Sequence, residues 1–316
     1  MSGPRALFLL LVAAIWLFAD AHIFVYHRFG DDRYPSTNTS IAELKREFEY
    51  LKRAGYRVVK MKTLVEALKR GKDIPDDWVV LTIDDGYKSF YEKGLEIFKE
   101  YNYPFTLFVA TKPTEKGYGD YMSWQQINDC SQYGEIGLHS HAHPHLTRLN
   151  RDQIEQDTKK GIELFKKRLG FYPEYYAYPY GEYDDRVKKI IKGFGFRAIF
   201  NQNSGAVAKE SDILDLDRTA LVGKSDIARK LKLKYLKASW IEPKEYPKDS
   251  ILKRIRIKIY EESPYAHIYV TDYGWKKVKV SEGKIEFNPG FKLKRERVRL
   301  IVKVKDSKIN TKILVK

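Results

Sequence analysis

Two carboxylates stand side by side at the end of an apolar run in this 316-residue chain. Asp84 and Asp85 follow the run Val79–Ile83 and precede Gly86, a residue type that permits a tight turn. Because neighbouring side chains of an extended chain point to different sides, the two acids can serve different chemical roles. A simple Asp-Gly turn with a solvated neighbour is the alternative interpretation of the same residues.

Four of the seven histidines of the chain lie in the short segment 139–145. They are His139, His141, His143 and His145, and a strand-like run precedes them. So many imidazoles in one segment favour a metal site, in which histidines and one aspartate would supply three ligands and leave positions for water and substrate. Composition alone does not choose which two histidines bind.

A third polar segment follows the apolar residues 175–177. In Tyr178-Pro179-Tyr180-Gly181, the proline and the glycine would fix a loop whose backbone N–H groups can point inward. Taken alone, such a sequence is usually only a turn.

The elements that must position these groups alternate between strands and helices from about residue 23 to 221. Amphipathic stretches at Ile41–Ala54 and Gln153–Leu169 predict two of the helices. Short β-branched and aromatic runs predict parallel strands at 23–26, 79–83, 105–110, 135–138, 175–178, 196–200 and 214–221. This pattern predicts an α/β fold, a distorted (β/α)7-type barrel, in which functional groups gather at the carboxyl ends of the strands.

After Lys224 the apolar residues recur at every second position. Ile255, Ile257 and Ile259 alternate with arginine and lysine, and the same pattern returns at 298–304. We therefore expect the barrel to occupy residues 22–224, and residues 225–316 to form a basic, antiparallel β-sandwich-like domain.

The net charge of +16 is concentrated in that second domain, because residues 231–316 carry 23 basic and 10 acidic side chains. Lysine and arginine on alternate strand positions are usually the solvated face of a half-buried sheet. The functional alternative is contact with an anionic polymer of the cell envelope. No recognised nucleic-acid motif is present, so we expect no nucleic-acid partner.

The N-terminus predicts export. Arg5 precedes the 14 apolar residues Ala6–Ala19, and Ala19-Asp20-Ala21 has the form of a signal-peptidase site. We interpret residues 1–21 as a signal peptide or an N-terminal anchor, and the protein as periplasmic, extracellular or envelope-anchored. The single cysteine, Cys130, excludes an intramolecular disulfide.

In order and spacing, the three polar segments resemble the motifs of the polysaccharide deacetylase family (carbohydrate esterase family 4, the NodB homology domain). The resemblance rests on the Asp-Asp-Gly strand end, the His-Ser-x-x-His-Pro segment and the Tyr-Pro-Tyr-Gly loop, and it runs from about Ile23 to Leu221. Val25-Tyr26-His27-Arg28 and Ala177–Gly181 are most similar to the subgroup of poly-β-1,6-N-acetylglucosamine N-deacetylases.

This resemblance implies a metal-dependent hydrolase that removes acetyl groups from N-acetylglucosamine units of an extracellular or envelope polysaccharide and releases acetate. Asp85, His139 and His143 would hold a divalent cation, commonly zinc, with nickel, cobalt or iron as alternatives. Asp84 would be the general base, and the backbone N–H of Tyr180, in the loop fixed by Pro179, would stabilise the oxyanion. His141 and His145 would be loop or supporting groups.

Two positions depart from the family pattern. Many members have an arginine in the third motif that pairs with the catalytic aspartate, where this chain has Ala177, and Arg218 is a candidate replacement. Many members also draw the general acid from a late Leu-x-His motif, but His267 is the only histidine after residue 145. We hypothesise that His27 is the acid, because the first and last strands of a closed barrel are neighbours. The alternative is a structural histidine that binds loop backbone.

Aromatic side chains suit the apolar faces of sugars, and Tyr180 and Trp124 are the candidates because they lie at predicted loop ends. The same chemistry on peptidoglycan, chitin-like oligosaccharides or a small amide remains an alternative, since the motifs are shared across these substrates. An alternative of another class is a catalytically silent carbohydrate-binding protein.

Overall fold

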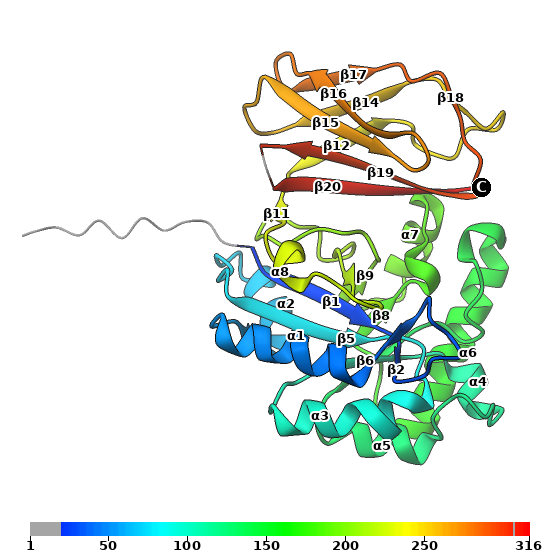
Figure 1. The fold of residues 1–316 in the computed structure, drawn as a ribbon. Helices are drawn as coiled ribbons and strands as arrows, with labels where there is room; N and C mark the ends of the chain where they lie inside the picture. Colours follow the sequence, from blue (N-terminus) through cyan, green and yellow to red (C-terminus); the bar gives the residue numbers. More distant parts are fainter. Residues whose placement is uncertain (1–19, 306) are drawn as a thin grey trace, which may run out of the picture.

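The computed structural model describes residues 20–305 and 307–316, in which a β/α body carries a second, all-β body (Figure 1). The apolar run of the expected signal peptide or anchor lies outside these residues. Among the helices that the structure describes, none has both the length and the apolar character needed to cross a membrane.

A parallel sheet forms the centre of the β/α body, and its strands follow the order β10-β1-β5-β6-β7-β8-β9, with β4 paired to β5 beside this path. A short parallel pair, β2 (Arg28–Phe29) and β3 (Asn38–Thr39), lies outside the sheet. The strands of the sheet are β1 (His22–Tyr26), β4 (Arg57–Val58), β5 (Trp78–Ile83), β6 (Thr106–Val109), β7 (Glu135–Leu138), β8 (Tyr175–Ala177), β9 (Ala198–Phe200) and β10 (Thr219–Ala220).

The segment 216–220 joins the two edges of this sheet. Leu216 forms a parallel bridge with Phe200 of β9, and Thr219 pairs with Phe24 of β1. The barrel predicted from the sequence is therefore confirmed. The last strand, expected as one run at 214–221, is instead a single bridge followed by the two-residue β10.

Helices cover the outside of the sheet, as Figure 1 shows. α1 (Ile41–Arg53) begins where the side chain of Ser40 accepts the N–H of Glu43, and its apolar side packs into the barrel core. The other helices are α2 (Met61–Lys69), α3 (Leu95–Glu100), α4 (Thr111–Glu115), α5 (Trp124–Ser131), α6 (Arg151–Leu169) and α7 (Asp185–Lys192), with a π-helical turn η1 (Phe90–Gly94) and 3-10 turns η2 (Leu146–Arg148) and η3 (Pro179–Gly181).

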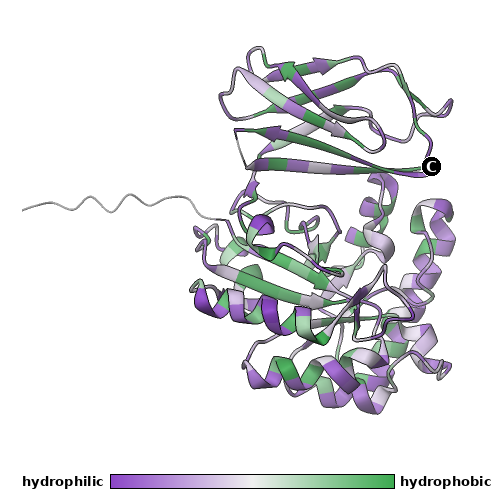
Figure 2. Cartoon of the chain, in the orientation of Figure 1, coloured by the Kyte–Doolittle hydropathy of each residue, from purple (hydrophilic) through white to green (hydrophobic). Residues whose placement is uncertain are grey.

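The strands of the barrel are apolar on both faces, which Figure 2 shows as green strands inside helices that are purple on the outside. Phe24 and Ile23 are neighbours in β1 but belong to two different clusters of buried residues. Burial on both faces explains why these strands read as continuous apolar runs in the sequence.

The all-β body, called the β body below, packs a five-stranded sheet, β11-β20-β19-β15-β16, against the three-stranded sheet β12-β14-β17, with a small pair β13-β18. Alternate residues of β14 and β19 are buried, as the period-two pattern predicted. One pairing differs from the antiparallel expectation, because β11 runs parallel to β20. The strands are β11 (Lys234–Tyr235), β12 (Ala238–Glu242), β13 (Ile251–Leu252), β14 (Ile255–Ile259), β15 (Tyr265–Val270), β16 (Gly274–Lys279), β17 (Lys284–Phe287), β18 (Phe291–Lys292), β19 (Arg297–Val304) and β20 (Lys308–Val315).

The two bodies are joined by packing and hydrogen bonds. α8 (Ile227–Lys230) belongs to the barrel, because Ile227 and Leu231 pack into its core, so the barrel continues past the expected boundary at residue 224. The hydroxyl of Thr311 in β20 donates to the carbonyl of Ser204, at 2.8 Å. The β body is therefore fixed against the loops of the barrel.

Candidate active site

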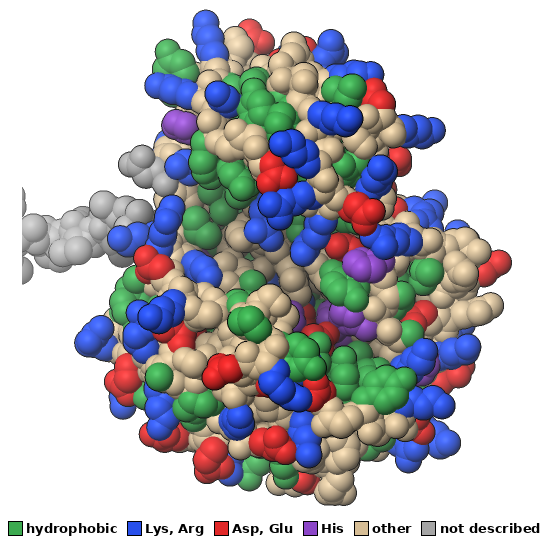
Figure 3. Space-filling model, turned by 45° about the vertical axis from the view of Figure 1, so that its right-hand side comes forward, with side chains coloured by type: hydrophobic (Ala, Val, Ile, Leu, Met, Phe, Trp, Pro, Cys, Tyr) green, Lys and Arg blue, Asp and Glu red, His purple; other side chains and the backbone are tan. Residues whose placement is uncertain are grey.

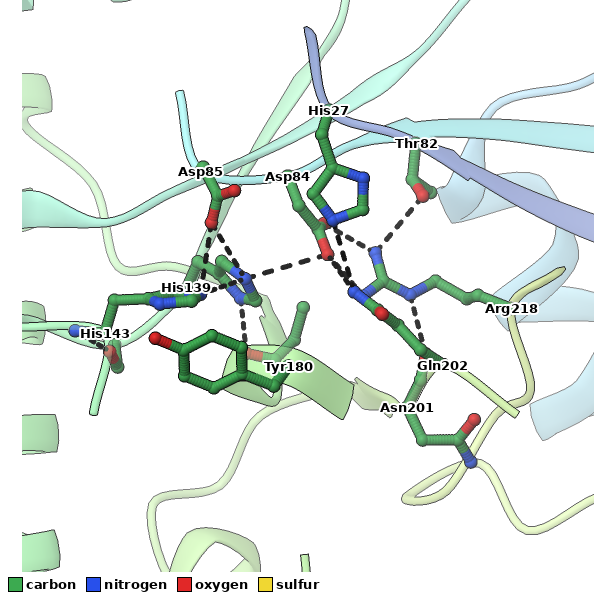
Figure 4. A network of polar contacts seen from close by, with 12 residues as sticks. His27, Thr82, Asp84, Asp85, His139, His143, Tyr180, Asn201, Gln202 and Arg218 are labelled. Atoms are coloured by element: carbon green, nitrogen blue, oxygen red, sulfur yellow. Dashed lines mark hydrogen bonds and ion pairs between the residues drawn. The ribbon is translucent and has the colours of Figure 1, made fainter. Parts of the chain in front are cut away.

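Three side chains from the ends of β5 and β7, the strands on either side of β6, converge at the open edge of the barrel (Figure 4). Asp85 Oδ1, after β5, lies 3.4 Å from His139 Nε2 and 3.1 Å from His143 Nε2, both after β7. The two Nε2 atoms are 3.2 Å apart. Ligands about 2.1 Å from one ion, at angles of about 90–109°, are separated by roughly 3.0–3.4 Å. These three donors therefore fit a single divalent cation.

Hydrogen bonding selects the tautomer of His139. Its Nδ1 lies 2.8 Å from the carbonyl oxygen of Ala177 in β8. Because a carbonyl only accepts, Nδ1 carries the hydrogen and Nε2 presents its lone pair toward Asp85. Burial lowers the pKa of His139 to about 4, so the ring is neutral, as metal binding requires.

The loop after β7 separates the four histidines that the sequence places together. Asp157 of α6 accepts hydrogen bonds from the backbone N–H groups of residues 141 and 142, at 3.0 and 2.9 Å, which folds the loop tightly. His141 then turns to Thr111, at 2.9 Å, and His145 to Glu182, at 2.7 Å. Only His139 and His143 face Asp85, so the structure distinguishes the pair that composition left open.

Asp84, next to this cluster, pairs with Arg218 rather than with the histidines. Both side chains are fully buried, and two guanidinium nitrogens lie 2.7 and 2.8 Å from the two carboxylate oxygens. Burial would raise the pKa of Asp84, but Arg218 and the neighbouring histidines outweigh it and hold the pKa below its usual value. Arg218 therefore stands where the sequence analysis placed a replacement for the arginine missing at Ala177.

His27 follows β1 and faces the same carboxylate from the other side. Gln202 connects them, since its Nε2 lies 3.2 Å from Asp84 Oδ2 and 3.4 Å from His27 Nε2. Among the described residues, Nδ1 of His27 is buried with no hydrogen-bond partner. Within the described part of the chain, this nitrogen therefore makes no hydrogen bond to loop backbone.

Tyr180 lies at the rim of the cluster in a left-handed backbone conformation, with φ 60°. Its ring stacks on His145, with ring centroids 4.1 Å apart, and meets His143 edge-on. The next residue, Gly181, allows a close approach, because a Cβ there would lie 2.4 Å from Gln202. Pro179 is buried at the start of the same turn.

Trp124 lies elsewhere. It begins α5, packs against the barrel core, and its indole N–H donates to Glu115, which also binds Arg168. The structure thus brings eight of the nine predicted site residues into one region, whereas Trp124 packs against the barrel core. The sequence analysis did not find Gln202, Thr82 or Asn201, which hold Asp84 and Arg218 in place.

Comparison with known proteins agrees with this geometry. Residues 71–199, which include the Asp-Asp-Gly and histidine segments and Tyr180, match the family model described as polysaccharide deacetylase. The matched part of the barrel is similar to a polysaccharide deacetylase domain, and the barrel is called the deacetylase domain below. The family resemblance drawn from the three motifs is thereby confirmed.

Named relatives of the deacetylase domain are similar at modest identity. The chain is 26% identical over 235 residues to the poly-beta-1,6-N-acetyl-D-glucosamine N-deacetylase of Escherichia coli K12, covering 61% of this chain. It spans about a third (34%) of the length of that relative. The enzyme of the same name from Staphylococcus aureus MRSA252 is 24% identical over 202 residues, covering 60% of this chain and 69% of that protein.

Solved structures share the fold of the deacetylase domain. The Streptococcus pyogenes deacetylase PplD, in complex with acetate, superimposes with a TM-score of 0.62 at 21% identity, covering 67% of this chain and 98% of that one. IcaB from Ammonifex degensii superimposes with a TM-score of 0.58 at 24% identity, covering 65% of this chain and 92% of that one.

Proposed function

We propose that the chain is a metal-dependent N-deacetylase that hydrolyses the acetamide of N-acetylglucosamine units in an exported polysaccharide and releases acetate. The observation that carries the proposal is the triangle of Asp85, His139 and His143 beside the buried pair of Asp84 and Arg218. The names of the modestly similar relatives support a polymer of β-1,6-linked N-acetylglucosamine as the substrate.

Zinc is the first choice of metal, because two imidazoles and a carboxylate are a common ligand set of catalytic zinc. Nickel, cobalt and iron accept the same donors. A divalent cation held here would lower the pKa of a water molecule and polarise the amide carbonyl.

We propose that Asp84 is the base that takes the proton from that water. Its Oδ2 lies 3.7 Å from His139 Nε2, beside the metal ligands but outside their triangle. Arg218 and Gln202 fix both carboxylate oxygens, and the pKa below its usual value keeps Asp84 ionised before reaction.

The departing sugar nitrogen needs a proton when the C–N bond breaks, and His27 is the candidate donor. Gln202 contacts both His27 and Asp84, so a substrate amide bound beside the metal ligands would have the candidate acid and the candidate base in the same region. The backbone N–H of Tyr180 is the candidate donor to the carbonyl oxygen as negative charge develops there. The products are acetate and a free amine on the sugar.

The apolar N-terminal run supports export, and the substrate would then lie outside the cytoplasm. Contact between the β body and an anionic polymer of the envelope stays a prediction. The nearly balanced charge of the first 230 residues suits a catalytic domain that acts on an uncharged acetylated sugar.

Acetate release from defined polymers tests the proposal. We expect the full chain loaded with zinc to release acetate from poly-β-1,6-N-acetylglucosamine, and the Asp84→Asn variant to be slower by about 100-fold or more with the same metal content. Chitin oligosaccharides and peptidoglycan in the same panel separate the substrate alternatives. A protein that binds acetylated glycan but releases no acetate from any of them would instead be a carbohydrate-binding protein.

A further inference from the structure

The five-stranded sheet of the β body turns one face toward the barrel, but the barrel covers only part of that face. Alternate residues of β20 from Ile309 to Ile313 are buried there, and Thr311 among them bonds to the barrel carbonyl of Ser204. The pairing register places Ile301 of β19 beside Thr311 on this face. The face therefore begins at the junction of the two bodies and continues past it.

Beyond β19 the same face is open over β15 and β16. Tyr269 pairs with Ile301 on one side and with Trp275 on the other, so the three side chains form a row across the sheet. The rings of Tyr269 and Trp275 touch, with centroids 5.3 Å apart, and Trp275 is 46% exposed. A partly exposed pair of aromatic rings is a surface on which the apolar face of a sugar can stack.

Basic side chains surround this aromatic pair. The Nζ of Lys303 lies 5.0 Å from the ring centroid of Trp275. The register assigns alternate residues of β15, β16 and β19 to this face, five of which are lysine or arginine and none aspartate or glutamate. This face of β15, β16 and β19 therefore carries aromatic and cationic side chains together, and these three strands place no acidic side chain on it.

The face reaches the active site through Arg297, the first residue of β19. One guanidinium nitrogen of Arg297 donates to the carbonyl of Tyr180, at 2.8 Å, and another lies 3.5 Å from Glu182. Arg299 follows on the same face, two residues along the strand. Figure 3 shows the same relation at the surface, with histidine side chains at the open edge of the barrel directly below the basic side chains of the β body.

We propose that this surface, defined by Tyr269, Trp275, Arg299 and Lys303 and called the β15–β19 face, binds the acetylated part of the polysaccharide chain whose reacting sugar occupies the barrel. The inference rests on the proposed deacetylase function. The β body would then be an extension of the substrate site, with Arg297 at the point where the two surfaces meet.

The positive charge of this face predicts that it prefers the acetylated form of the polymer to the deacetylated form. Deacetylation turns a neutral acetamide into an amine that is protonated at neutral and acidic pH. The lysine and arginine side chains of the face repel that ammonium group, whereas the acetylated sugar carries no charge to repel. The face therefore holds unreacted chain more tightly than product, and salt weakens the difference.

Comparing a long substrate with a short one distinguishes binding at the β15–β19 face from catalysis in the barrel. We expect Trp275→Ala and Tyr269→Ala to raise KM for the acetylated polymer by about 10-fold, in proportion to the loss of about 1–2 kcal/mol of ring stacking, without changing kcat. An acetylated disaccharide, too short to reach from the barrel to the face, should be hydrolysed at the wild-type rate. Tyr260→Ala is the matched control, because Tyr260 is 51% exposed but follows β14 of the other sheet.

Binding to the Asp84→Asn full chain gives a readout that needs no turnover. We expect an acetylated oligosaccharide to bind more tightly than its deacetylated form at low salt. Lys303→Gln in the same background should reduce this difference, whereas Trp275→Ala should weaken the binding of both forms. The proposal is overturned if the aromatic variants slow the disaccharide and the polymer equally, if the deacetylated form binds more tightly, or if only an anionic polymer such as a polyuronate binds. Failure of the wild type to release acetate from any glycan would refute the deacetylase function, while this binding comparison would still decide the role of the face.

Discussion

Arg218 and Asp84 form a two-point ion pair inside the barrel, with both side chains fully buried. Arg218 is itself held by the carbonyl of Asn201, at 2.9 Å, and by the hydroxyl of Thr82, at 3.2 Å. The candidate base is therefore fixed by a residue 134 positions later in the chain, on the segment that closes the barrel. On the proposed mechanism, catalysis and barrel closure would depend on the same contact.

Arg218→Lys should damage activity more than folding. A lysine keeps the positive charge but offers one point of contact instead of two, so the carboxylate of Asp84 loses its orientation. We expect acetate release to fall by about 10-fold or more with unchanged zinc content. Arg218→Ala leaves a buried carboxylate unpaired and should lower the free energy of unfolding by about 3–5 kcal/mol, measured by urea denaturation. Full activity of Arg218→Lys would show that the two-point contact is unnecessary.

His27→Ala should lower kcat on acetylated sugars by about 100- to 10,000-fold, because His27 is the proposed donor of the proton to the departing nitrogen. An aryl acetate is the informative second substrate, since its phenolate leaves without a proton and should be hydrolysed at nearly the wild-type rate. His267→Ala, a substitution in β15 of the β body, is the control and should keep the wild-type rate on the disaccharide. Equal losses on amide and ester would argue against the acid role of His27.

Arg297→Ala should loosen the turn that carries Tyr180. The variant removes the hydrogen bond that the guanidinium group donates to the carbonyl of Tyr180, and hydrogen bonds of this charged kind contribute about 1.5–3 kcal/mol. It also removes the cation that lies beside Glu182. We expect kcat on the disaccharide to fall by about 10-fold with little change in metal content. Arg295→Ala is the matched control, because Arg295 is more exposed and pairs only with Asp272 among the described residues. Identical rates in the two variants would show that the β body does not support the turn.

Glu47 makes the stability of the barrel depend on pH. It is fully buried in α1, accepts the hydroxyl of Tyr26 at 2.7 Å, and burial raises its pKa to about 8. Between about pH 4.5 and 8, the carboxyl group of Glu47 stays protonated in the native state but loses its proton in the unfolded state. The free energy of unfolding therefore falls as the pH rises through this range.

Glu47→Gln tests this dependence, because glutamine preserves the shape without ionising. Urea unfolding at several pH values should show that the variant loses less stability between pH 5 and pH 8 than the wild type does. The difference in slope should not exceed about 1.4 kcal/mol per pH unit, the limit for one proton. Parallel pH profiles would mean that Glu47 is ionised in the folded protein.

The sequence predicted the site where local patterns carry the information. Asp84, Asp85 and His139 each follow an apolar run that ends a strand, and parallel strands bring their carboxyl ends to one edge. The alternation of Arg297–Val304 likewise predicted β19, because one of its faces must be buried.

Other parts of the site depend on contacts that no local pattern records. Gln202 lies in an irregular loop, and its place between Asp84 and His27 follows only from closure of the barrel. The contact of Arg297 with Tyr180 depends on how the two bodies dock. Trp124 was expected to meet substrate because it lies at a predicted loop end, but the capping box at Ser123 starts a helix there and the indole N–H donates to Glu115.

Acetate release with and without a chelator tests the central claim most directly. The account predicts that the full chain releases acetate from an N-acetylated glucosamine polymer, that a chelator stops the release and added zinc or cobalt restores it. It also predicts that His143→Ala folds normally but neither binds zinc nor releases acetate. Acetate release that persists after complete removal of metal, or a zinc-loaded protein that releases none from any acetylated glycan, would contradict the account.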